Sequence, residues 1–285
     1  MLYAQLKSLP EDYIKSKVEE FLLEDAPLGD FTANAIFPEI RKGKAIIEAE
    51  EDMVFAGRQV IPYFFDDTVK INMYCDDGDF IKNKATIAVI ESNVSHLLRI
   101  ERPLLNLLQR LCGVATHTRK YVKKAMGSGI RILDTRKTTP GLRIFEKYAV
   151  ICGGGNNHRL DLSSGILIKD NHIKAAGSIT FAIEKVKAMN YGLPIELEVD
   201  NFKQIEEALR EEIDGILLDN FSPEETKEAV DFIRAFPTLK KVFIESSGGI
   251  NINNIEPYLT TGVNAISIGA ITHSAPAANI HMEFE

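Results

Sequence analysis

The spacing of hydrophobic positions changes along this chain. Residues 9–24 carry apolar side chains at helical spacing, which predicts an amphipathic helix. Between residues 44 and 91, short apolar runs separated by glycine and aspartate predict strands. Residues 96–126 are again helical in their spacing, and we expect Pro103 and Gly113 to divide them into shorter helices. The first part of the chain is therefore predicted to be a small α+β region.

After Gly129 the pattern becomes an alternation of apolar strands with amphipathic helices. Such βα repetition predicts a parallel barrel or a doubly wound sheet. The strands are expected at residues 130–134, 165–169, 194–200, 214–220, 240–249 and 263–270, and the helices at 178–189, 201–212, 222–236 and 251–262.

Polar residues and glycines recur where these strands end, which favours the barrel. In a parallel barrel the strand ends converge on one face, whereas a doubly wound sheet gathers them at one crevice. Taken singly, Glu198 and Asp219 could be solvated loop carboxylates, and Asp219 could cap the next helix. Taken together, the strand ends predict a functional site. They are Lys169, Glu198, Asp219, Ser246–Gly249 and Gly269.

Length and composition describe a globular protein without a membrane partner. The chain has 285 residues, 45% of them hydrophobic, which allows one large domain with a smaller companion. No apolar run approaches the roughly 20 residues of a membrane span, and the N-terminus lacks the features of a signal peptide. The three cysteines are far apart and form neither a metal-binding pair nor an even set for disulfides. We therefore expect a cytoplasmic protein.

Several cations are concentrated in residues 134–173, although the net charge is -8. An acidic protein repels a polyanion, so nucleic acid is not the expected partner. Arginine offers a planar fork to a carboxylate, and lysine a mobile charge to a phosphate, so a small anion suits this cluster. The cations are Arg136, Lys137, Arg143, His158, Arg159, Lys169 and His172.

Two further features indicate a phosphorylated ligand. Glycines near residues 246–249 and 268–270 allow backbone N–H groups to approach a phosphate closely. Glu198 and Asp219, on neighbouring strand ends, suit a Mg²⁺ ion that itself holds phosphates. Together with the cations, these features fit a sugar-diphosphate donor and a second substrate that carries carboxylates.

A set of longer motifs occurs in order along nearly the whole chain. They are GDFT at 29–32, ERPLLNLLQRLCGVAT at 101–116, DTRKTTPGLR at 134–143, GGGNNHR at 153–159, IKDNH at 168–172, ELEVD at 196–200, LDN at 218–220, ESSGGI at 245–250 and GAITHS at 269–274. This set resembles the quinolinate phosphoribosyltransferase family. The departures, at residues 161–164 and at Cys112, touch no residue assigned to the site.

The resemblance implies a fold, a reaction and an assembly. The fold is an incomplete parallel α/β barrel of about seven strands at residues 110–274, with an N-terminal open α/β sandwich domain at residues 1–109 that the tail 275–285 joins. The reaction transfers phosphoribosyl from 5-phosphoribosyl-1-pyrophosphate to quinolinate with decarboxylation, giving nicotinate mononucleotide, CO₂ and pyrophosphate. The implied cofactor is Mg²⁺, and the implied assembly is a homodimer, at least, with shared active sites.

The resemblance also implies roles for individual residues. Quinolinate should be bound by Arg136, His158, Arg159 and Lys169, with Arg102 from the other subunit, although composition alone favours an exposed Arg102 near a helix start. The catalytic residues should be Lys137, Lys169, Glu198 and Asp219, of which Glu198 and Asp219 also face the ribose and Mg²⁺. The phosphoribosyl donor should further contact Lys137, Ser247, Gly248, Gly269 and His273.

Two alternatives remain open. One is a homologue of the same fold found with molybdate-transport genes, in which the NHR and IKDNH segments diverge; both segments are intact here. The other is a barrel lyase that uses Lys169 as a Schiff-base nucleophile. Asp170 follows that lysine, and a neighbouring anion favours its charged, unreactive form.

Overall fold

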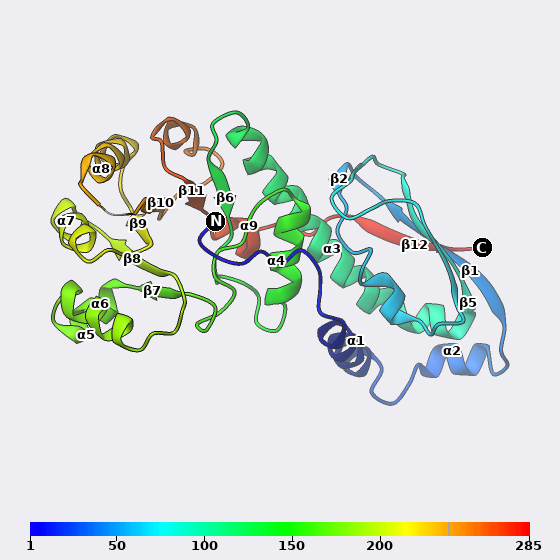
Figure 1. Ribbon diagram of the computed structural model, residues 1–285. Coiled ribbons are helices and arrows are strands. Elements are labelled where there is room, and N and C mark those ends of the chain that lie inside the picture. Colours follow the sequence, from blue (N-terminus) through cyan, green and yellow to red (C-terminus); the bar gives the residue numbers. More distant parts are fainter. Residues whose placement is uncertain (239) are drawn as a thin grey trace. The chain divides into compact units, whose positions relative to one another are not determined.

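The computed structural model describes residues 1–238 and 240–285, which form two compact units that interleave along the chain (Figure 1). The barrel unit comprises Met1–Gln5, Lys120–Arg143 and Gly155–Ser274, and the sandwich unit comprises Leu6–Arg119, Ile144–Gly154 and Ala275–Glu285. The division into domains 1–109 and 110–274, with the tail 275–285, remains a prediction.

The barrel unit is built on a parallel sheet with the strand order β6-β11-β10-β9-β8-β7. The strands are β6 (Arg131–Leu133), β7 (Ile166–Ile168), β8 (Ile195–Val199), β9 (Gly215–Asp219), β10 (Phe243–Ser247) and β11 (Ala265–Ser267). Consecutive strands are neighbours from β7 to β11, and β11 returns to β6, which is the order of a barrel rather than of a doubly wound sheet.

The barrel is open between β7 and the segment at Asn156. An isolated parallel bridge joins Asn156 to Leu133 of β6, so a seventh short segment extends the sheet beyond β6. Within the described residues, no strand pairing connects this segment to β7. Among the described strands, the barrel is therefore not closed by strand pairing at this point.

Helices follow the strands and cover the outside of the sheet (Figure 1). Ser178, Asn201 and Ser222 each accept a hydrogen bond from the backbone N–H three residues later, which caps the first turns of α6, α7 and α8. The helices are α5 (Asp170–Ala176), α6 (Ile179–Ala188), α7 (Phe202–Arg210), α8 (Pro223–Ala235) and α9 (Ala270–His273).

The helix expected at residues 251–262 is reduced to a short 3-10 helix, η2 (Glu256–Thr260). Asn254 Oδ1 accepts from the backbone N–H of Asn251 at 2.7 Å, which stabilises a turn in place of a helix. Pro257 lacks the backbone N–H that a longer helix would use. The prediction of a full helix was therefore wrong.

The sandwich unit contains an antiparallel sheet with the order β12-β1-β5-β3 and a separate pair, β2 with β4. The strands are β1 (Lys42–Ala49), β2 (Met53–Val54), β3 (Lys70–Met73), β4 (Phe80–Ile81), β5 (Thr86–Asn93) and β12 (Ile280–Phe284). The helical segments are α1 (Glu11–Asp25), α2 (Phe31–Ile36), η1 (Ile61–Phe64) and α4 (Arg143–Cys152), of which α4 belongs to this unit except for Arg143. The fold class predicted from the sequence, an incomplete parallel α/β barrel with an N-terminal α/β sandwich, is confirmed.

One continuous helix, α3 (Val94–Ala125), replaces the shorter helices expected between residues 96 and 126. Pro103 lies inside it, although an interior proline costs about 3 kcal/mol. The buried face, which includes Leu104, Leu108 and Leu111, offsets this cost because burying each leucine contributes about 1.5–3 kcal/mol. Gly113 also lies inside the helix, and a Cβ there would overlap the backbone carbonyl of Pro276, so glycine allows this close approach.

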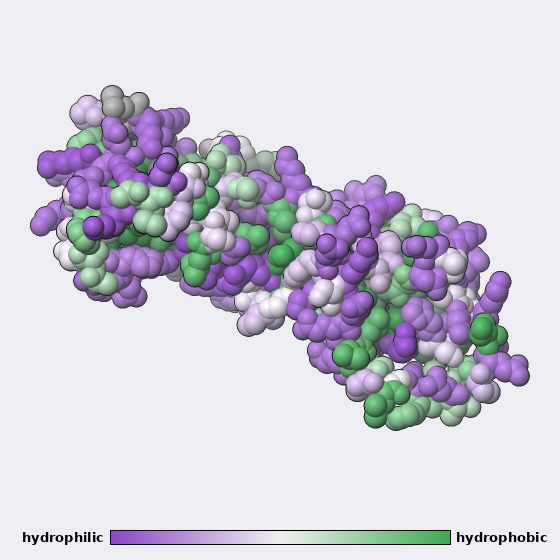
Figure 2. All heavy atoms as spheres, turned by 60° about the horizontal axis from the view of Figure 1, so that its bottom comes forward, coloured by the Kyte–Doolittle hydropathy of each residue, from purple (hydrophilic) through white to green (hydrophobic). Residues whose placement is uncertain are grey.

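The surface is largely hydrophilic, with apolar patches on the face shown in Figure 2. None of the helices in the described part of the chain is long and apolar enough to cross a membrane. Exposed apolar side chains are frequent between the end of α1 and the start of β1. Leu23, Leu28, Phe31, Ile36 and Ile40 are each more than 60% exposed.

Candidate active site

A pocket of about 570 Å³ opens where the barrel strands end, and its lining residues all belong to the barrel unit. Its wall includes apolar side chains from β7 and β9, Leu167 and Leu217, but polar groups predominate. The predicted site residues that line it are Arg136, Lys137, His158, Arg159, Lys169, Glu198, Asp219, Ser247 and Gly248. The structure thus brings these residues together, while their individual roles remain predictions.

Two carboxylates lie on neighbouring strands at the edge of this pocket. Glu198 is on β8 and Asp219 ends β9. Glu198 Oε2 accepts a hydrogen bond from Lys169 Nζ at 2.7 Å, and Asp219 Oδ2 accepts one from Asn220 Nδ2 at 2.7 Å. Carboxylate oxygens are ligands that Mg²⁺ prefers, so this donor set fits the ion, with its other ligands from water and phosphate.

Two arginines contribute positive charge to the pocket. Arg136 Nε is buried and has no hydrogen-bond partner among the described residues. Arg159 is 5% exposed and donates from Nη1 to the carbonyl of Gly165 at 3.1 Å. Burial, together with the Arg136 guanidinium, lowers the pKa of Arg159, yet an arginine stays charged in proteins. A bound anion would compensate both charges.

His158 has both ring nitrogens engaged within the protein. Its Nδ1 accepts a hydrogen bond from the backbone N–H of Arg159 at 2.8 Å, so the ring hydrogen is on Nε2. Nε2 lies 3.1 Å from Glu196 Oε2 and 3.7 Å from Glu245 Oε1. The ring therefore points to buried carboxylates. A contact between His158 and quinolinate remains a prediction.

Sequence reasoning missed the buried polar groups beneath the pocket. Glu196 and Glu245 are fully buried, on β8 and β10. The available signal was a charged residue inside an apolar strand. Side chains two positions apart on a strand share a face, so Glu196 lies on the same face as the predicted site residue Glu198. Burial and the Glu196 carboxylate raise the pKa of Glu245 to about 8, while His158 opposes the rise.

Asp134 was missed as well, although it follows β6. It is fully buried, and its carboxylate accepts hydrogen bonds from Asn157 Nδ2 at 2.6 Å and from the backbone N–H of His158 at 2.9 Å. It thereby fixes the segment that presents His158 and Arg159. Its place at a strand end was a usable signal.

Gly248 is required by close packing at the end of β10. Its φ is +91°, and a Cβ there would overlap the side chain of Asn220. The backbone N–H of Asn220 donates to the carbonyl of Ser247 at 2.9 Å, and Ser267 Oγ donates to Ser247 Oγ at 2.9 Å. This geometry brings main chain close to the pocket, as a phosphate cradle requires.

Gly269 and His273 lie beside the pocket rather than in its described lining. A Cβ on Gly269 would lie 2.9 Å from Lys137 Cδ and 3.2 Å from His273 Cδ2, so Gly269 adjoins the side chains of both Lys137 and His273. Arg102 belongs to the sandwich unit, on α3, with a side chain that is 60% exposed and 3.9 Å from Glu101. Its contribution to the active site of a neighbouring subunit remains a prediction.

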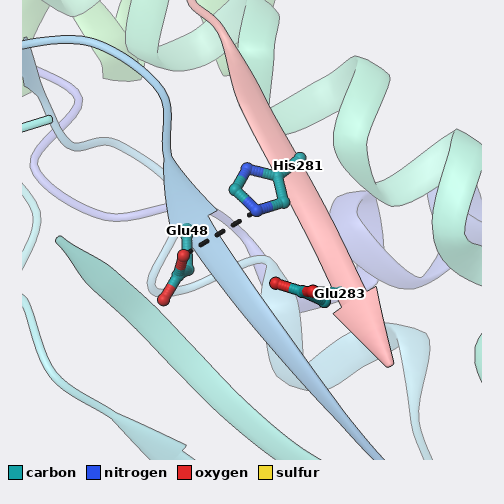
Figure 3. A group of neighbouring side chains, drawn as sticks. All are labelled: Glu48, His281 and Glu283. Carbon is teal, nitrogen blue, oxygen red and sulfur yellow. Dashed lines mark ion pairs between the residues drawn. The ribbon is translucent and has the colours of Figure 1, made fainter. Parts of the chain in front are cut away.

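Two groups of three potential metal ligands occur among the described residues. His158, Glu196 and Glu245 form one, in which hydrogen bonding already accounts for the close approach of His158 and Glu196. Glu48, His281 and Glu283 form the other, on the paired strands β1 and β12 (Figure 3). His281 Nε2 lies 3.7 Å from Glu48 Oε2, and Glu283 is exposed, so this group lies toward the surface of the sandwich unit and away from the pocket residues of the barrel unit in sequence.

Two family models match this chain. The model described as the quinolinate phosphoribosyl transferase C-terminal domain matches residues 114–283, and the N-terminal domain model matches residues 30–112. Together they match more than half of the chain, with residues from both units.

Curated and solved proteins give the same result. The chain is 41% identical over 276 residues to the probable carboxylating nicotinate-nucleotide pyrophosphorylase of Bacillus subtilis, covering 95% of this chain and 93% of that protein. It is 38% identical over 280 residues to the carboxylating nicotinate-nucleotide pyrophosphorylase of Mycobacterium leprae, covering 95% and 97%. The solved nicotinate-nucleotide pyrophosphorylase of Francisella tularensis superimposes with a TM-score of 0.92 at 36% identity, covering 99% of each chain.

Proposed function

This chain belongs to the quinolinate phosphoribosyltransferase family, and from that membership we propose how its pocket carries out the family's reaction. The enzyme transfers phosphoribosyl from 5-phosphoribosyl-1-pyrophosphate to quinolinate with decarboxylation, and gives nicotinate mononucleotide, CO₂ and pyrophosphate. The observation that carries the proposal is the grouping of arginines, lysines and two carboxylates around one pocket at the strand ends.

The arginines of the pocket bind the two carboxylates of quinolinate in this proposal. The unpartnered Nε of Arg136 and the buried guanidinium of Arg159 are suited to planar, two-point contact with a carboxylate. Lys169 adds a further charge at the end of β7, and His158 helps to orient Arg159. Fixed contacts of this kind hold the pyridine ring in one orientation.

The transfer step then needs positioning and charge stabilisation. The pyridine nitrogen attacks C1 of the ribose while the bond from C1 to the pyrophosphate oxygen breaks. The sugar becomes positively charged in the transition state, and Glu198 and Asp219 stabilise that charge. Lys137 and Lys169 neutralise the departing pyrophosphate, and the side chains of Ser247 and His273 with the backbone near Gly248 and Gly269 hold the 5-phosphate.

Decarboxylation follows from the charge on the ring nitrogen. Once the nitrogen is bonded to ribose it is cationic, so it stabilises the electron pair left at C2 when the C2 carboxylate leaves as CO₂. C2 then takes up a proton from water. The protein supplies orientation and electrostatics, and no covalent intermediate with the protein is required.

We propose Mg²⁺ as the cofactor, held by Glu198 and Asp219 together with water and the donor's phosphates. When bound, the ion neutralises charge on the pyrophosphate.

For the location we propose the cytoplasm, which suits three buried cysteines that are all free.

Neither alternative function gains support from the pocket. Lys169 forms an ion pair with Glu198 at 2.7 Å, whereas a Schiff-base lysine must be neutral to attack a carbonyl. The molybdate-associated homologue is disfavoured by the intact NHR and IKDNH segments, which supply Arg159 and Lys169 to the pocket.

Substrate choice tests the assignment of the cations. Nicotinate lacks the 2-carboxylate, so part of the cation cluster would stay buried and unpaired, and we expect quinolinate to be preferred by about a thousandfold or more in kcat/KM. Turnover of each acid is measured by mass detection of nicotinate mononucleotide. Comparable turnover of nicotinate would contradict the proposed contacts.

A homodimer with shared sites is the assembly we propose. The exposed apolar side chains of residues 23–40 support a partner surface, since large exposed apolar patches commonly mark interaction sites. Arg102 is exposed on α3 and would reach the partner's pocket.

Mixing two inactive variants tests this assembly. If Arg102 serves the partner, Arg102→Ala and Arg136→Ala are each nearly inactive, while a mixed dimer has one intact site. Random exchange makes about half the dimers mixed, so about a quarter of the wild-type activity should return by two-fold symmetry. If subunit exchange is verified by mass and activity is not recovered, Arg102 does not contribute to the partner's site.

A further inference from the structure

Gln5 pairs with the backbone at the open edge of the barrel. Its Nε2 donates to the carbonyl of Asn157 at 2.9 Å, and its Oε1 accepts from the backbone N–H of Asn157 at 2.8 Å. These are the two hydrogen bonds that a neighbouring strand would supply. Nε2 also donates to the carbonyl of Tyr3 at 3.0 Å, which ties the N-terminal segment into the same contact.

Tyr3 reaches the buried side of the same segment. Its ring centroid lies 4.6 Å from that of His158, and its hydroxyl donates to Glu196 Oε2 at 2.7 Å. Gly165 leaves room for this ring, because a Cβ there would overlap Tyr3 Cε1. The tyrosine is 5% exposed, so a residue near the end of the chain is fully engaged in the barrel.

These contacts continue to Arg159. Glu196 Oε2 is within hydrogen-bond distance of both the Tyr3 hydroxyl and His158 Nε2, so the tyrosine fixes the acceptor that orients the imidazole. The other imidazole nitrogen, Nδ1, accepts from the backbone N–H of Arg159. Moving the ring would therefore move the peptide that carries the guanidinium.

We infer that residues 3–5 position Arg159 from the open edge of the barrel, acting through His158 and the 156–159 segment, with Tyr3 and Gln5 as positioning residues for quinolinate. This inference rests on the proposed role of Arg159 in binding a quinolinate carboxylate. Neither Tyr3 nor Gln5 lines the pocket, so they act through the 156–159 segment and do not touch the substrate.

Steady-state kinetics with both substrates tests the inference. Tyr3→Phe removes one hydroxyl and keeps the ring, and Gln5→Ala removes the backbone pairing. Each should raise the KM for quinolinate about tenfold, the effect of about 1.4 kcal/mol, and leave the KM for the phosphoribosyl donor unchanged. The matched control is Ala4→Ser, since Ala4 is exposed between the two residues and should behave as wild type.

A second measurement separates positioning from stability. Hydrogen exchange on the folded variants should show faster exchange at the amides of Asn157 and His158. An unchanged KM for quinolinate in both variants, or unchanged exchange at these amides, would overturn the inference even if the thermal midpoint falls. Arg159→Ala is the reference: if its KM for quinolinate is normal, the proposed role of Arg159 fails instead.

Discussion

Replacing Glu245 with glutamine should remove a pH dependence of stability that the folded barrel creates. Burial of this carboxyl group, with Glu196 nearby, raises its pKa from 4.5 to about 8. Between these values the folded state binds more protons than the unfolded state, so the free energy of unfolding falls as pH rises. The stability that the protonated Glu245 carboxyl group contributes is fully present below about pH 4.5 and is lost above about pH 8.

The size of the effect follows from the shift. One pKa unit corresponds to about 1.4 kcal/mol, so ionisation of Glu245 lowers the free energy of unfolding by at most about 5 kcal/mol. Glutamine resembles the protonated carboxyl group in size and cannot ionise. The stability of Glu245→Gln relative to wild type should therefore increase as pH rises through this range.

Urea unfolding of both proteins at several pH values between about 5 and about 9 measures this difference. Groups that titrate equally in the two proteins contribute nothing to the difference between their free energies of unfolding. Glu228→Gln is the matched control, because Glu228 is exposed on α8 and its replacement also removes one negative charge. The control should keep the wild-type pH profile. A stability difference between Glu245→Gln and wild type that stays constant with pH would refute the reasoning.

Three further outcomes are expected. Arg136→Lys should lose about a hundredfold or more in kcat/KM, nearly as much as Arg136→Ala and with an unchanged thermal midpoint, because lysine cannot make the two-point contact; near-normal kinetics in the lysine variant would contradict this geometry. Excess chelator should abolish turnover but barely move the thermal midpoint without substrate, whereas unfolding by chelator would indicate a structural metal site. Gly113→Ala should destabilise the protein by about 1–3 kcal/mol in urea unfolding, because its Cβ overlaps the Pro276 carbonyl; wild-type stability would disprove that close approach.

The sequence predicted the barrel and much of its pocket because both depend on local patterns. Apolar runs mark the parallel strands, and polar residues such as Glu198 and Asp219 mark their carboxyl ends. Parallel strands place those ends on one face, so residues far apart in the chain could be grouped without knowing any contact.

The sequence could not predict features that depend on distant packing. The continuity of α3 through Pro103 depends on a buried face, which outweighs a local helix-breaking preference. Tyr3 meets Glu196 across 193 positions of the chain, and nothing in the spacing near residue 3 indicates that contact. Gln5 was equally hidden, because its partner is the backbone of Asn157.

The fate of the 2-carboxylate of quinolinate tests the central claim most directly. The enzyme is incubated with quinolinate that carries a carbon isotope label in the 2-carboxylate, with 5-phosphoribosyl-1-pyrophosphate and Mg²⁺, and the products are identified by mass. The account predicts unlabelled nicotinate mononucleotide, with all of the label in CO₂ and one pyrophosphate released for each CO₂. Absence of nicotinate mononucleotide, or a phosphoribosylated product that keeps the label, would contradict it.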